Sequence, residues 1–126
     1  MKKKVLTMFL ALILAFSLTN VATASTFYFS IPTPYAGSMQ VTSTATAPTK
    51  SPYVQPTIYS TLTCYFLSPR GSKTDLATNV VSTSTAGKYA FAYKTGYGGS
   101  GQYYALSAYP GTHQYTEYTV WGNWST

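Results

Sequence analysis

The chain has 126 residues, of which 8% are charged and 17% aromatic, and thirteen of the aromatic residues are Tyr. This length allows one domain with a leader but not two full domains. A single Cys excludes an internal disulfide framework, and one His with two acidic residues leaves little material for acid/base, metal or phosphate chemistry. We therefore predict no catalytic residue, no metal site and no cofactor.

The first 24 residues have the order of a secretory signal peptide. Three Lys residues at positions 2–4 precede an apolar run over 5–18, and the small residues Ala22 and Ala24 form the cleavage pattern. The apolar run is too short to span the roughly 30 Å hydrocarbon core as a helix, so we expect cleavage after Ala24 and no retained membrane anchor. Residues 25–126 are then a single domain, secreted and either free or associated with the cell wall.

Removal of the leader leaves five basic and two acidic side chains, a net charge of +3. The five cations are scattered along the chain, so we expect no nucleic-acid partner. Leu, Ile, Val and Phe number only 15 in residues 25–126. The core must therefore rely on Tyr and Trp rings, which bury about 150–250 Å² each.

Alternation of apolar and polar residues predicts strands from the start of this domain. Phe27 and Phe29 share one face of a strand over 27–31, and Tyr28 lies on the other. A second strand is predicted at 39–44. Proline recurs every four residues in 47–56, so this segment is predicted as an extended edge or as a crossover between two sheets.

The strongest strand pattern covers residues 57–67. Leu62, Cys64 and Phe66 share a face that we expect to point inward, and both faces are partly apolar, which predicts a central strand. Further strands are predicted in segments separated by Gly and Pro turn signals, with a flexible glycine loop at 96–101; these strands cover 75–83, 88–94, 102–109 and 115–124.

About seven strands with frequent turns predict an all-β fold. The antiparallel β-sandwich is the expected architecture, and a small β-barrel is the alternative closure of the same strands. The segment Val120-Trp121-Gly122-Asn123-Trp124-Ser125 resembles the V-x-G-x-W-S ending of small secreted Gram-positive proteins of unknown function. The resemblance covers residue 88 onward, and it implies a secreted β-sandwich and no activity.

The few reactive side chains have plain structural interpretations. Cys64 is predicted to be a small buried hydrophobe; the alternatives are an intermolecular disulfide and a pairing with His113, which lacks an orienting third group. Asp75 and Glu117 are the only carboxylates after the leader, and we assign them no catalytic role.

The number of Tyr residues exceeds what a single small core is expected to hide. We predict binding through aromatic rings outside the core, at Tyr35, Tyr53, Tyr97, Trp121 and Trp124. The predicted function is non-enzymatic binding of a cell-wall glycan or a protein outside the cell. The alternatives are a bacteriocin-like antagonist of neighbouring cell envelopes and an extracellular-matrix or self-assembling protein. The sequence leaves the oligomeric state open.

Overall fold

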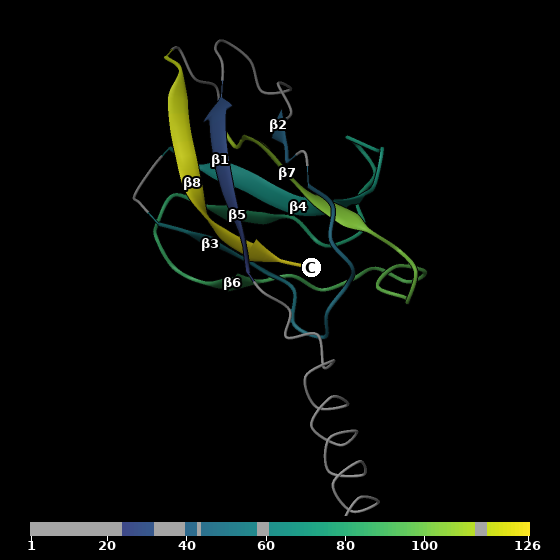
Figure 1. Ribbon diagram of the computed structural model, residues 1–126. Coiled ribbons are helices and arrows are strands. Elements are labelled where there is room, and N and C mark those ends of the chain that lie inside the picture. The colour runs from purple at the N-terminus through teal and green to yellow at the C-terminus, as the bar shows by residue number, and fades with distance from the viewer. Residues whose placement is uncertain (1–23, 32–39, 43, 58–60, 113–115) are drawn as a thin grey trace, which may run out of the picture.

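The structure is a computed structural model, and it describes residues 24–31, 40–42, 44–57, 61–112 and 116–126 (Figure 1). These ranges are all-β, with two antiparallel sheets of four strands that form a β-sandwich, as predicted. No helix within them is long and apolar enough to cross a bilayer. The leader up to residue 23, including Ala22, lies outside the described residues, as do Tyr35 and His113.

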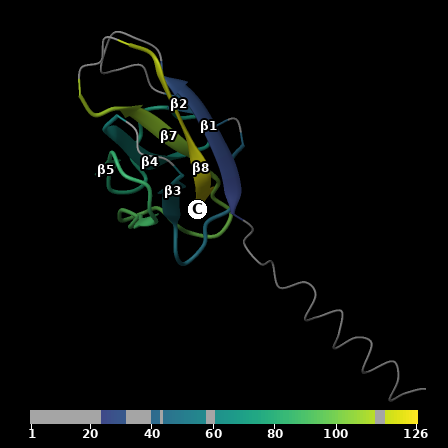
Figure 2. The same ribbon diagram turned by 90° about the vertical axis from the view of Figure 1, so that its left-hand side faces the viewer.

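Each sheet draws its strands from distant parts of the chain. Sheet A has the order β1 (Ser25–Ile31), β8 (Tyr118–Ser125), β3 (Tyr53–Pro56) and β6 (Tyr89–Ala90). Sheet B has the order β2 (Gln40–Val41), β7 (Tyr104–Pro110), β4 (Thr63–Pro69) and β5 (Val81–Thr83). Figure 2 shows β1 and β8 on one side of the molecule and β4 and β5 on the other.

The core between the sheets is built largely from aromatic rings, as the composition predicted. The Phe27 ring of sheet A lies with its centroid 5.3 Å from that of Phe29 and 5.8 Å from that of Tyr65 in sheet B. Trp124, Tyr104 and Phe91 are further buried rings of the same core. Aromatic rings from both sheets thus meet in the core, together with branched aliphatic side chains such as Leu67, Leu106 and Val120.

The predicted inward face of β4 is wrong. Tyr65 and Leu67 point into the core, where they pair in register with Ala108 and Leu106 of β7. Cys64 and Phe66 lie on the outer face of sheet B, although both are buried. The pattern misassigned the faces because β4 is buried on both sides, so burial along it does not alternate.

The proline segment does cross from one sheet to the other. Thr46 forms a bridge with Tyr104 next to sheet B, and residues 53–56 then enter sheet A as β3. The predicted edge position is wrong, because β3 lies between β8 and β6. Pro56 is tolerated there because alternate N–H groups point to opposite neighbours, and β6 pairs only with residues 53 and 54.

The strands predicted at 75–83 and 88–94 are shorter than expected because both segments leave their sheets. Phe91 donates its N–H to the Pro52 carbonyl in sheet A, at 2.8 Å. Two residues later, Tyr93 forms a bridge with Thr78, whose neighbour Ala77 bonds to Leu67 of sheet B. This segment therefore joins the two sheets along one side of the sandwich.

Candidate functional site

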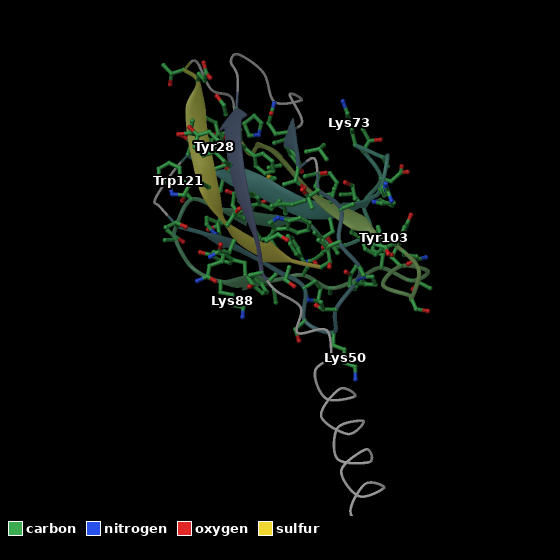
Figure 3. All side chains as sticks on the ribbon, viewed as in Figure 1. Tyr28, Lys50, Lys73, Lys88, Tyr103 and Trp121 are labelled. Carbon is green, nitrogen blue, oxygen red and sulfur yellow. The ribbon has the colours of Figure 1, made fainter. Side chains whose placement is uncertain are left out.

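The outer face of sheet A carries two adjacent exposed aromatic rings. Burial alternates along β1 and β8, so that Tyr28 and Trp121 point outward while Phe27, Phe29 and Val120 point inward. Tyr28 and Trp121 are opposite each other in the strand register. Their ring centroids lie 6.3 Å apart, with 21° between the planes, and Figure 3 shows the two side chains next to each other.

These rings keep much of their surface in contact with solvent: Tyr28 is 68% exposed and Trp121 is 37% exposed. Beside them lies an open hollow of about 720 Å³, lined also by hydroxyl and amide side chains, those of Thr26, Thr57, Thr119 and Asn123. None of the described residues that line it is acidic or basic. We call Tyr28, Trp121 and these four polar residues the aromatic platform.

The outer face continues from the platform toward β6. Gln55 is opposite Asn123, and Tyr53 is opposite Ser125, so polar and aromatic groups extend across β3. Tyr53 is half-buried, and Lys88 places its Nζ 4.2 Å from the centroid of the Tyr53 ring, within the range of a cation–π contact. A single charged group therefore flanks the otherwise neutral face at this end.

Gly122 allows β8 and β3 to approach closely beneath the platform. A Cβ atom at this position would lie 2.0 Å from the Gln55 carbonyl oxygen, a distance that no side chain tolerates. Gly122 is paired with Phe27 on one side and Pro56 on the other. The glycine therefore keeps the three strands of the platform in one continuous sheet.

Trp124 is not exposed, contrary to the prediction. It is fully buried between the sheets, where it is opposite Val54 in the register and belongs to the core. The reason is the strand period: Val120, Gly122 and Trp124 point inward, whereas Trp121 and Asn123 point outward. The two Trp residues of one strand thus have opposite environments.

Tyr97 lies apart from the platform, in the glycine loop, and is 37% exposed. The loop predicted to be flexible is organised by hydrogen bonds: Gly98 donates its N–H to the Tyr104 hydroxyl at 2.7 Å, and Gly99 donates to Gln102 Oε1 at 3.1 Å. Of the five predicted residues, the structure thus brings Tyr53 and Trp121 to one face and leaves Tyr97 elsewhere.

The sequence-based selection missed two exposed rings, Tyr28 and Tyr103. The signal for Tyr28 was available, since it alternates with Phe27 and Phe29 in the predicted first strand. Tyr103 likewise alternates with Tyr104, whose side chain is buried in the core. In each case the residue opposite a predicted core position was the better candidate for exposure.

Of the remaining reactive groups, Glu117 lies beside the outer face of sheet A, and Cys64 and Asp75 lie away from it. Cys64 is buried, as predicted, and its Sγ lies 3.1 Å from the Ser82 hydroxyl. The Ser30 hydroxyl donates a hydrogen bond to Glu117 Oε1, and Asp75 is exposed after β4. Among the described residues, no three His, Cys, Asp or Glu side chains gather as a metal site would require.

Comparison of the chain with protein-family models, with curated proteins and with solved structures gives no match. The geometry of its own residues is therefore the basis for a functional proposal. That geometry defines a small antiparallel β-sandwich with an exposed, nearly uncharged aromatic surface on one sheet.

Proposed function

We propose that the protein is a secreted, non-enzymatic binding protein that holds an extracellular glycan on the outer face of sheet A. The observation that supports this most directly is the pair of near-parallel rings of Tyr28 and Trp121, which border a hollow lined with hydroxyl and amide groups. A sugar ring has the complementary chemistry, because its C–H faces pack on aromatic rings while its hydroxyl groups exchange hydrogen bonds with polar neighbours.

A glycan suits this face better than a protein partner does. Stable protein interfaces bury about 800 Å² on each partner around an apolar centre. Apart from Tyr28, Trp121 and the half-buried Tyr53, the outer face of sheet A is polar, and its exposed polar residues include Thr26, Gln55 and Asn123. Such a surface offers hydrogen-bond donors and acceptors in a line, which matches a saccharide chain lying across the strands.

The platform is also held in place before a ligand arrives. Tyr28 and Trp121 project from paired strands, and Tyr and Trp side chains have only two rotatable bonds to order. Little conformational freedom is therefore lost when a sugar packs against them. This reduces the entropic penalty that usually weakens binding to isolated surface side chains.

The position of the predicted cleavage site supports the secretory part of the proposal. β1 begins at Ser25, immediately after Ala24, and Ser25 is opposite Trp124 in sheet A. Cleavage after Ala24 would leave the whole of β1 in the mature chain. N-terminal sequencing of the protein recovered from the culture medium should therefore begin at Ser25; a start inside β1 or a retained leader would contradict this proposal.

Calorimetric titration with neutral β-1,4-linked hexamers of N-acetylglucosamine and of glucose tests the glycan proposal. We expect Trp121→Ala and Tyr28→Ala each to weaken binding about tenfold or more, as central aromatic contacts do. Tyr103→Ala is the matched control, because it removes another exposed ring far from the platform (Figure 3) and should leave the affinity unchanged. No binding of either hexamer by the unaltered protein, or an equal loss in all three variants, would overturn the proposal.

A further inference from the structure

A second open hollow lies on the side of the molecule away from the platform. Its volume is about 440 Å³, and Arg70, Lys73 and Tyr103 line it together with Val41 and Ala105 of sheet B. Figure 3 shows Lys73 and Tyr103 on the opposite side of the sandwich from Tyr28 and Trp121. We call this hollow the basic cleft.

The turn after β4 sets the position of both cations. Ser72 donates its N–H to the Pro69 carbonyl at 2.9 Å, and Gly71 between them has a φ of 83°, a conformation that favours glycine. Arg70 donates its own N–H to the Tyr103 carbonyl at 2.9 Å. The backbone that carries Arg70 is therefore fastened to the residue that supplies the aromatic ring of the cleft.

Arg70 and Tyr103 form a ridge between two hollows. The guanidinium carbon lies 6.0 Å from the centroid of the Tyr103 ring, and the ring is 46% exposed. A smaller hollow of about 290 Å³ lies against the same pair, where Tyr97 and Gln102 contribute to the lining. A chain molecule can therefore cross the ridge and contact both hollows.

The two cations of the basic cleft have no ion-pair partner among the described residues. Arg70 and Lys73 are exposed, and within the described part of the chain neither forms a salt bridge. Asp75 and Glu117 are not among the described residues that line the cleft, and Glu117 accepts its hydrogen bond from Ser30 of sheet A. The cleft thus offers two cations to an incoming anion with no carboxylate in its wall.

We propose that the basic cleft binds an anionic saccharide or polyol chain, with its phosphate or carboxylate group held between Arg70 and Lys73 and the neighbouring sugar or polyol unit against Tyr103. Guanidinium groups hold such oxyanions through two parallel hydrogen bonds, and an exposed ring provides a surface for the unit beside the anion. This site is separate from the platform in position and in ligand chemistry, so it stands without the neutral-glycan proposal.

Affinity electrophoresis in native gels tests the inference with three polymers: poly(glycerol phosphate), polygalacturonate and neutral dextran. We expect one or both anionic polymers, but not dextran, to retard the protein. Which of them does so distinguishes a phosphate from a carboxylate as the source of the anion. Added salt should weaken the retardation, because the contact is electrostatic.

Single-charge variants separate a site from general attraction to a polyanion. Arg70→Gln should weaken retardation about tenfold, and Lys73→Gln and Tyr103→Ala should weaken it several-fold. Lys50→Gln is the matched control, since it removes the same charge from an exposed position remote from the cleft (Figure 3). Trp121→Ala should leave the retardation by poly(glycerol phosphate) unchanged, because this polymer has no sugar ring to pack on the platform.

Three outcomes would overturn the inference. These are no retardation by either anionic polymer, equal retardation by dextran that persists in Trp121→Ala, and an equal loss in Arg70→Gln and Lys50→Gln. Thermal unfolding of each variant provides the folding check, because all the altered side chains are exposed and their replacement should leave the melting temperature nearly unchanged.

Discussion

The outer faces of the two sheets differ although both sheets have four antiparallel strands. On sheet A, Tyr28 is exposed, as are Thr26 and Asn123. On sheet B, Phe66 is only 1% exposed, and the small side chains of Ser68 and Ser107 on the same face are also buried. The comparison shows why the platform is proposed on sheet A: β1 and β8 are amphipathic, whereas the central strands β4 and β7 of sheet B are buried on both faces.

The polar groups on the outer face of sheet B satisfy one another. Ser68 and Ser107 share a hydrogen bond at 2.7 Å between their hydroxyl oxygens. Phe66 packs edge-on against Tyr109, with ring centroids 6.1 Å apart. Groups that are buried and paired within the protein are not available to a partner, while the hydroxyl and amide groups of the platform remain open to solvent.

The strongest test of the difference between faces uses the two Trp residues of β8. Trp124→Ala should lower the free energy of unfolding by about 3–5 kcal/mol, because it empties a site in the aromatic core. Trp121→Ala should change it by less than about 1 kcal/mol, because this ring lies on the surface. Urea unfolding followed by circular dichroism measures both. Similar losses would contradict the assignment of faces; Trp124→Phe provides a folded variant if Trp124→Ala does not fold.

The second test compares the two outer faces directly. Phe66→Ala should destabilise the protein by about 3 kcal/mol, whereas Tyr28→Ala should alter stability by less than about 0.5 kcal/mol. The reason is that only the Phe66 ring is removed from water by folding. The urea midpoints of the two variants give the comparison, provided that the unfolding free energy of both falls equally steeply with urea concentration. A small loss in Phe66→Ala would mean that the outer face of sheet B is as open as that of sheet A.

Gly122 tests whether the platform depends on the close approach of β8 and β3. Gly122→Ala should cost about 1–3 kcal/mol, because the new Cβ collides with the Gln55 carbonyl and must displace a backbone. It should also weaken binding at Trp121 in the same sheet. Gly99→Ala is the control, since its Cβ would meet only Gln102 at ordinary contact distance. Equal stability of the two variants would show that β3 and β8 can move apart at little cost in free energy.

The smallest expected effect concerns Tyr93, whose ring packs on the core beside Tyr104. Burial raises the pKa of the Tyr93 phenol above its ordinary value, and the nearby Tyr104 acts in the same direction. The folded protein therefore keeps a proton that the unfolded chain loses above about pH 10, so stability should fall as pH rises through this range.

Tyr93→Phe should reduce that alkaline loss. At neutral pH it should leave stability within about 0.5 kcal/mol of the unaltered protein, because within the described ranges the Tyr93 hydroxyl has no hydrogen-bond partner. Urea midpoints between pH 8 and pH 11 measure how steeply the stability falls with pH. Tyr28→Phe removes an exposed hydroxyl, and its stability should fall with pH as steeply as that of the unaltered protein. A steeper fall in Tyr93→Phe would show that another group governs the alkaline transition.

Local alternation predicted part of the candidate site. It placed Tyr28 opposite Phe27 and Phe29, although Tyr28 was not among the predicted binding residues. Trp121 and Tyr53, chosen as aromatic residues, also lie on the outer face of sheet A. It did not separate Trp121 from Trp124, although the two are three residues apart in one strand and a period of two puts them on opposite faces. The error lay in choosing residues by amino-acid type and not by the strand face on which the two-residue period places them.

The basic cleft was beyond the reach of sequence reasoning. Arg70 and Tyr103 are distant in the chain, and only the pairing of β4 with β7 places the turn after one strand beside the start of the other. The scattered cations seen in the sequence gave no sign of this arrangement. Charge clustering in space depends on strand register, which the composition does not contain.

The amino-acid sequence alone determines an all-β domain with an aromatic core, because its alternating segments are short, turns are frequent and helix-forming residues are few. Which face of β4 and β7 meets the core was decided only by the tertiary structure. In β1 and β8, burial alternates and agrees with the sequence pattern. β4 and β7 are buried on both faces, so their inward face is set by the strands with which they pair. When both faces of a strand carry apolar side chains, the sequence pattern does not show which face points inward, and the pairing with distant strands must decide it.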